Sequence, residues 1–339
     1  MRSTALLAIL IAALLLLPRW GASATPRQIV IQFSHVTAAH TPKGMGAERF
    51  KQLAEQRTGH RVKVEIYPNS QLYKDSEELQ ALYLGSVQML APSLGKLGLT
   101  GVHGFEVFDL PYLIPDRRAL ERVTDGPVGR ALLKRLEPHG FVGLAYWENG
   151  FKLMSANRPL RMPQDFRGLK FRIQSSKILD AQMRQLGAIP QVLAFSEIYQ
   201  ALQTGMIDGS ENTASNMFTQ KHFEVQSHAT LSHHGYIGYA VIVNKRFWEQ
   251  LPPDIRAELE SAMRDATLYV NAVAREQNEA ALAAMKASGQ IDIHVPTARE
   301  RAAWAEALRP VQDEMAERVG SDLVADIRAA IASETSDAH

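Results

Sequence analysis

Apolar and polar residues follow two different periods along this chain. Val62–Tyr67 alternates every second residue, which predicts a half-buried strand, whereas residues 43–57 repeat apolar positions at helical spacing and stop before Gly59. The two patterns alternate along the chain. They predict further strands at 28–33, 87–91, 141–147 and 169–173 and further helices at 76–84, 128–136, 176–186 and 196–204. Repeated alternation of strand and helix predicts an α/β fold.

The C-terminal third has a different pattern. Pro253–Ser288 contains no internal Gly or Pro and is rich in helix formers, which predicts one long helix or two joined end to end. At full length it would extend about 50 Å, which is longer than one lobe. Thr297 and Glu300 form a capping box that predicts the start of another helix. Residues 321–331 predict a last helix, and 333–339 are expected to fray.

The N-terminus has the order of a secretory signal. Arg2 precedes an unbroken apolar run at 5–17, and Ala22 and Ala24 form a small-residue cleavage pattern. The run is too short for a membrane helix, which needs about 20 residues. We therefore predict that residues 1–24 are a cleaved signal peptide and that the remaining chain is exported.

The amino-acid composition narrows the classes of protein to which this chain can belong. The chain has no cysteine, which excludes disulfides and thiolate metal sites. Without the signal peptide it carries 35 basic and 36 acidic residues with no run of like charge, so we expect no nucleic-acid or membrane partner. About 315 residues exceed one ordinary core, which favours two lobes.

Two short crossovers are expected to join these lobes. Residues 149–150 and 235–238 contain glycines that suit a hinge. We therefore predict one lobe from 25–149 plus 238–278 and the other from 150–237 plus 279–332. The chain is expected to be a monomer.

Motifs for catalysis and metal binding are missing from the sequence. It contains no H-E-x-x-H, no G-x-S-x-G and no G-x-x-x-x-G-K-[ST] pattern. Four histidines cluster at 222–234, but the adjacent His233 and His234 would point apart on a strand, which argues against zinc. We expect no cofactor and no metal, and we expect a binding protein; an exported hydrolase stays open as an alternative.

The strand around Arg172 is the most informative segment. Leu169, Phe171 and Ile173 share one face, and Lys170, Arg172 and Gln174 share the other. A guanidinium binds a carboxylate through two parallel hydrogen bonds. From this pattern alone, Arg172 is either such an anchor in a cleft or a polar residue on a surface strand.

Six segments together resemble the DctP-type solute receptors of tripartite ATP-independent periplasmic (TRAP) transporters. They lie at 33–36, 67–72, 168–173, 194–205, 208–212 and 244–248, and the resemblance extends over about 28–324. It implies two α/β domains around a ligand cleft, a long helix across both, and a periplasmic location. It also implies capture of a solute by hinge closure and delivery to a membrane permease driven by a sodium gradient.

The resemblance also assigns residues. Arg172 matches the family's carboxylate-binding arginine, Asn212 matches a hydrogen-bond donor to the ligand, and Phe195 matches an aromatic residue that packs over it. Asn212 could instead cap a helix, and Phe195 could be ordinary core. Lys152 stands where relatives place a second cation, although it could be a solvated strand residue.

Three further residues complete the predicted ligand site. His35 and Ser93 resemble ligand contacts from the first lobe, and Tyr236 could donate a phenolic hydrogen bond from the second crossover. Each also has a structural alternative, as a buried histidine, a capping serine or a core tyrosine.

Segments 105–111 and 232–236 are similar to the branch that binds C4-dicarboxylates such as malate, succinate and fumarate. Arg172 and Asn212 would hold one carboxylate, and Lys152, His35, Ser93 and Tyr236 would supply the other end. Another small acid (a 2-oxo, aromatic or sugar acid) stays open as the ligand. Presentation of the ligand to a sensor kinase also stays open.

Overall fold

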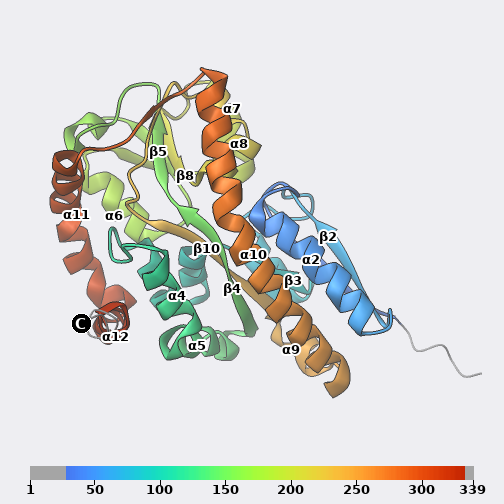
Figure 1. Ribbon diagram of the computed structural model, residues 1–339. Helices are drawn as coiled ribbons and strands as arrows, with labels where there is room; N and C mark the ends of the chain where they lie inside the picture. The colour runs from blue at the N-terminus through green and yellow to red at the C-terminus, as the bar shows by residue number, and fades with distance from the viewer. Residues whose placement is uncertain (1–27, 333–339) are drawn as a thin grey trace, which may run out of the picture.

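The computed structural model describes residues 28–332, which form two α/β lobes, each built on its own sheet (Figure 1). This confirms the predicted α/β architecture. The predicted signal peptide at 1–24 and the predicted frayed end at 333–339 lie outside the described residues.

The first lobe contains a five-stranded sheet in the order β2-β1-β3-β10-β4. Its strands are β1 (Ile29–Ser34), β2 (Val62–Tyr67), β3 (Met89–Leu90), β4 (Phe141–Phe151) and β10 (Tyr236–Asn244). Its helices are α2 (Pro42–Arg57), α3 (Glu78–Leu84), α4 (Arg117–Asp125), α5 (Pro127–Lys134) and α9 (Lys245–Glu249). β3 is shorter than the predicted 87–91 at both ends. At its C-terminal end Pro92 has no N–H to continue the ladder, and pairing resumes as a single bridge between Ser93 and Tyr239.

The second lobe contains a six-stranded sheet in the order β11-β9-β5-β8-β6-β7. Its strands are β5 (Leu153–Ala156), β6 (Lys170–Ile173), β7 (Ile189–Val192), β8 (Gly209–Asn212), β9 (His228–Thr230) and β11 (Asp292–His294). Its helices are α6 (Lys177–Gln185), α7 (Ile198–Gln203) and α8 (Ala214–Thr219). Strand β6, which carries Arg172, lies between β8 and β7 and is parallel to both.

Two crossovers connect the sheets and pair with each other. Lys152 alone separates β4 of the first sheet from β5 of the second, and the chain returns between β9 and β10. The Lys152 N–H donates to the Gly235 carbonyl at 3.0 Å, and the His233 N–H donates to the Lys152 carbonyl at 3.0 Å. The hinge region is therefore a hydrogen-bonded ribbon.

The long helix α10 (Pro253–Ser288) has the bounds that the sequence pattern predicts. It contacts α2 and β4 of the first lobe and α8 of the second, and it passes diagonally across both in Figure 1. Its approach to α2 requires Gly46, because a Cβ there would lie 2.1 Å from the Val270 side chain.

Two C-terminal helices cover the other side of the molecule (Figure 1). The predicted capping box opens α11 (Ala298–Val319), which packs on α6 and on the 3₁₀ segment His103–Asp109. Helix α12 (Ser321–Ala332) packs on α4 and α5 of the first lobe, so the assignment of 279–332 to the second lobe stays a prediction. Within residues 28–332, no helix is both long and apolar enough to cross a membrane.

Candidate functional site

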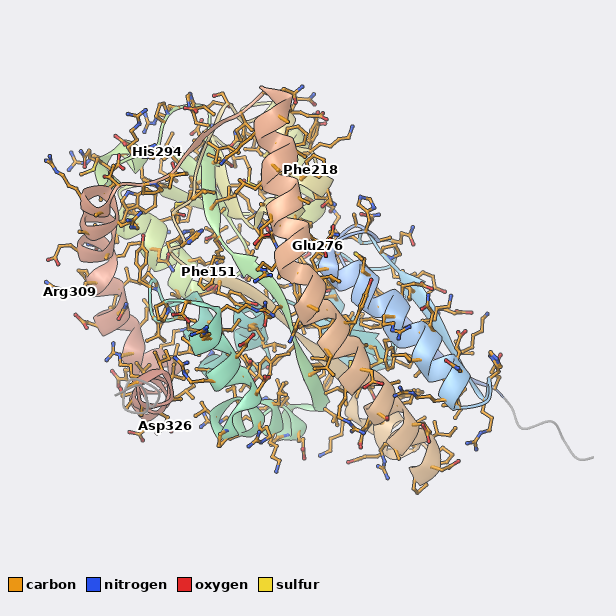
Figure 2. All side chains as sticks on the ribbon, in the orientation of Figure 1. Phe151, Phe218, Glu276, His294, Arg309 and Asp326 are labelled. Atoms are coloured by element: carbon orange, nitrogen blue, oxygen red, sulfur yellow. The ribbon has the colours of Figure 1, made fainter. Side chains whose placement is uncertain are left out.

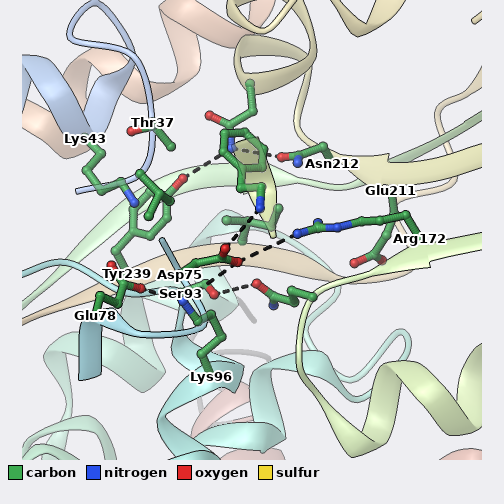
Figure 3. Close-up of a pocket in the computed structure, with 15 residues that line it drawn as sticks. Thr37, Lys43, Asp75, Glu78, Ser93, Lys96, Arg172, Glu211, Asn212 and Tyr239 are labelled. Atoms are coloured by element: carbon green, nitrogen blue, oxygen red, sulfur yellow. Dashed lines mark hydrogen bonds and ion pairs between the residues drawn. The ribbon is translucent and has the colours of Figure 1, made fainter. Parts of the chain in front are cut away.

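A narrow pocket lies between the two lobes, and Figure 3 shows it from close range. Its free volume is about 40 Å³, because side chains from both lobes meet across it. Ser93 Oγ of the first lobe donates to Gln174 Oε1 of the second at 2.5 Å, and the Phe195 N–H donates to Asp75 Oδ1 at 3.0 Å. The two lobes therefore contact each other directly across the pocket.

Arg172 reaches this pocket from β6, and its side chain is almost fully buried. Its Nε and Nη2 donate to the Leu193 carbonyl at 3.1 and 2.8 Å, which fixes the plane of the guanidinium. The nearest carboxylate is Asp75, at 3.8 Å from Nη2. Burial lowers the pKa of Arg172 and Asp75 opposes this shift, so the group keeps its charge. Arg172 is thus a fixed cation with one long ion pair, to Asp75.

Asn212 lies at the end of β8 and also lines the pocket. Its Oδ1 accepts from the Thr213 N–H at 2.9 Å and from Asn216 Nδ2 at 2.8 Å. These bonds orient the amide so that Nδ2 remains a donor for a ligand. Thr213, not Asn212, is the residue that precedes α8 as its N-cap.

Phe195 and Ser93, the other two predicted contacts in the pocket lining, come from opposite lobes. Phe195 is 6% exposed and contacts the His222 ring edge to face, with ring centroids 6.1 Å apart. It therefore forms an apolar wall of the pocket.

Lys43 is a pocket residue that sequence reasoning missed. It extends from the first turn of α2, is 1% exposed, donates to the Ala91 carbonyl at 3.1 Å, and lies 3.9 Å above the Tyr239 ring. Burial lowers the pKa of Lys43 to about 7, with Lys96 adding to the effect and Glu78 opposing it. The sequence contained a clue to Lys43: a cation is unfavourable in the first turn of a helix, so a lysine there suggests a specific role.

Three other charged residues of the pocket come from the first lobe. Lys96 is paired with Glu78 at 2.5 Å and lies 3.9 Å from Asp75. Lys43 has no carboxylate within ion-pair distance among the described residues. Among the described residues, Lys43 thus has no carboxylate partner and Arg172 has one long ion pair with Asp75, and the two cations enter the pocket from opposite sides (Figure 3).

Lys152 lies at the hinge and does not line this pocket. It is fully buried, and its Nζ lies 3.2 Å from Asp109 Oδ1 and 3.0 Å from Glu211 Oε1. Glu211 Oε2 is 2.8 Å from His234 Nε2. Burial would raise the pKa of Glu211, but Lys152 and His234 lower it to about 2. Lys152 therefore neutralises buried carboxylates from both lobes.

His35 and Tyr236 also lie outside the pocket lining. His35 is fully buried behind it, with Nδ1 3.4 Å from the pocket residue Thr37; burial and then Lys43 lower its pKa to about 3. Tyr236 lies on the opposite face of β10 from Ile237 and Tyr239, which do line the pocket, because successive strand residues alternate.

The chemistry of the pocket is that of charge recognition. Between residues 28 and 332, no group of three or more His, Asp or Glu side chains is placed to hold a metal. Two cations on opposite lobes, one amide donor and one aromatic wall define a two-lobed solute-binding protein for an anion.

Comparison with known proteins places this chain in a family. A family model described as bacterial extracellular solute-binding protein, family 7 (DctP), matches residues 33–318, and the chain belongs to this family. The C4-dicarboxylate-binding periplasmic protein DctP of Rhodobacter capsulatus is 63% identical over 304 residues, which cover 90% of this chain and 91% of the relative. The resemblance found in the sequence is thereby confirmed.

Solved structures agree with this assignment. A TRAP periplasmic solute-binding protein from Shewanella oneidensis with bound succinate is 41% identical, with a TM-score of 0.88 over 90% of this chain and 99% of the other. A second, from Pseudomonas aeruginosa with bound L-malate, is 43% identical, with a TM-score of 0.82 over 84% of this chain and 99% of the other. The two-lobed architecture of the family is thus shared along nearly the whole described chain.

Proposed function

We propose that this protein is a periplasmic receptor that binds a C4-dicarboxylate between its lobes and delivers it to a TRAP permease. The observation that carries the proposal is a pair of incompletely neutralised cations. Arg172 in the second lobe has an ion pair with Asp75 that is 3.8 Å long, and Lys43 in the first lobe has no carboxylate within ion-pair distance among the described residues. A molecule with a carboxylate at each end would satisfy both and would pull the lobes together. The names of the relatives support the ligand class, and family membership supports the permease partner.

One carboxylate is assigned to Arg172 and Asn212, and the other to Lys43. Arg172 offers a fixed fork of donors, and Asn212 adds a neutral donor beside it. Lys43 offers a point charge that, among the described residues, donates a hydrogen bond to the Ala91 backbone carbonyl and has no carboxylate within ion-pair distance. The proposal includes no catalytic step: the ligand leaves unchanged.

Calorimetry tests the ligand class directly. Succinate is expected to bind with a Kd in the micromolar range or below, about −8 kcal/mol. Butyrate has the same carbon chain length but one carboxylate, and it should bind about 2–5 kcal/mol more weakly because one buried cation stays unpaired. Mass spectrometry of the recovered succinate should show no change. Tight binding of butyrate or of a sugar acid, with no heat from succinate, would contradict the proposal.

The pH dependence of succinate affinity tests the role of Lys43. Its pKa of about 7 in the free protein means that it is charged below pH 7 and largely neutral above. Binding above pH 7 must therefore take up a proton, and affinity should fall by up to about tenfold per pH unit between pH 7 and 9. The Lys43→Arg variant, which stays charged, should lose this slope. An unchanged slope in that variant would remove Lys43 from the ligand site.

A further inference from the structure

A second cavity, of about 290 Å³, lies on the other side of the hinge from the ligand pocket. Its walls come from the β4–β5 crossover, the start of β10 and the inner face of α10. Figure 2 labels Phe151, one of its lining residues, on the crossover beside α10. Tyr236 lines this cavity, whereas Ile237 and Tyr239 of the same strand line the ligand pocket.

The cavity is apolar inside and has ion-paired charges at its edge. Phe151, Leu153, Leu231 and Leu282 are among its lining residues. The charged side chains in the lining pair with one another: Arg117 Nε is 2.9 Å from Glu148, and Arg275 Nε is 3.6 Å from Glu279. No charge is therefore left for a ligand to neutralise at these positions, which favours an uncharged occupant.

Two buried polar atoms of the cavity lining, Arg117 Nε and the Tyr236 hydroxyl, donate no hydrogen bond to a described residue, and Arg117 Nε is compensated by its ion pair with Glu148. Tyr236 is 5% exposed, and its hydroxyl donates no hydrogen bond to a described residue. The backbone group that affects its pKa is the Asn149 N–H, which is a donor, so the phenolic hydrogen still has no acceptor. Burial raises the pKa of Tyr236 well above its usual range, so the hydroxyl keeps this hydrogen. A buried hydroxyl is normally hydrogen-bonded, and a ligand carbonyl would complete this one.

We propose that this cavity binds an uncharged fused-ring molecule with a single carbonyl acceptor, and that its occupation favours the closed lobes. A cavity of about 150 Å³ accommodates benzene, so twice that volume fits a bicyclic compound. The apolar walls contact the rings of the ligand, and the Tyr236 hydroxyl donates a hydrogen bond to the ligand carbonyl.

The coupling between cavity and cleft, which rests on the proposed function, follows from shared residues. Asn149 donates through Nδ2 to the Tyr239 hydroxyl in the ligand pocket, at 2.8 Å. Its backbone carbonyl accepts from Asn278 of the second cavity, also at 2.8 Å. The cavity is present here together with cleft contacts such as Ser93 to Gln174, so an occupant stabilises this closed arrangement.

Titration of the protein without its signal peptide with 1-indanone tests the site, with indane as the probe that lacks the carbonyl. We expect saturable binding of 1-indanone and binding of indane weaker by about three- to tenfold, the effect of one hydrogen bond. Tyr236→Phe should bring the two probes to the same affinity. Leu282→Trp, which fills the cavity, should abolish binding of both while the protein still melts cooperatively. Absent binding of 1-indanone, or an unchanged preference in Tyr236→Phe, would overturn the proposed site.

A second titration tests the coupling. Succinate affinity should rise when 1-indanone is saturating, and 1-indanone affinity should rise by the same factor when succinate is saturating, because linkage is reciprocal. Equal or lower succinate affinity would overturn the coupling. If succinate did not bind at all, the proposed function would fail, while binding of 1-indanone alone would still decide the existence of the second site.

Discussion

Replacing Arg172 with alanine is expected to weaken succinate binding by at least about 2 kcal/mol, a loss of thirtyfold or more. The guanidinium is buried, held by the Leu193 carbonyl and 3.8 Å from Asp75, its nearest carboxylate, so a ligand carboxylate in direct contact would be a closer counter-charge. Without it, one carboxylate of the ligand would be buried unpaired. Isothermal titration calorimetry with succinate measures the loss.

Two variants separate charge from geometry in this experiment. Arg172→Lys keeps the charge but loses the two-pronged donor, and its affinity should fall between wild type and Arg172→Ala. Arg184→Ala removes a largely exposed arginine of the same lobe and should leave affinity unchanged. Because Arg172 is buried, each variant should also be checked by thermal melting. Wild-type affinity in a folded Arg172→Ala protein would remove Arg172 from the site.

Replacing Lys152 with methionine is expected to lower the free energy of unfolding by about 3–5 kcal/mol. Lys152 is fully buried between Asp109 and Glu211, and its removal leaves two carboxylates without their shared cation. Urea denaturation at neutral pH measures the change. Lys63→Met, which removes a lysine from an exposed pair with Glu65, is the matched control and should have little effect.

The same variant distinguishes the two interpretations of Lys152. If Lys152 is a structural residue of the hinge, its loss reduces the free energy of unfolding more than it reduces succinate affinity. A Lys152→Met protein with wild-type stability and lost succinate affinity would instead support the ligand contact that the sequence suggests. The second outcome would also require a cleft geometry different from the one described, in which Lys152 does not line the pocket.

Local elements were predictable because their causes are local. The helix Pro253–Ser288 needs only an uninterrupted run of helix formers, and the Thr297–Glu300 cap needs only residues three positions apart. The strand Val62–Tyr67 follows from alternation of buried and exposed positions. Strand β3 is shorter than predicted at both ends, and at its C-terminal end Pro92 interrupts the ladder.

The placement of individual side chains was less predictable. Periodicity placed Arg172 and Phe171 on opposite faces of a strand, but only the packing of the second lobe shows that the Arg172 face is buried and borders the cleft. Lys152 and Tyr236 lie at the two crossovers, which the sequence places beside the cleft. In the structure, Lys152 is buried at the hinge, and Tyr236 faces the second cavity on the other side of it. A shift of one residue along a strand exchanges these faces.

By itself, the sequence determined the α/β class, the long helix, the family, and Arg172 as the leading candidate for a carboxylate anchor. The tertiary structure decided which charges remain available to a ligand. Lys43 and Arg172 lie 129 positions apart, and Lys96 is neutralised by Glu78 while Lys43 is not. Whether a cation has a partner depends on distances of a few ångström between distant segments, because Coulomb energy in a buried site changes steeply over that range. Residue spacing along the chain does not contain those distances.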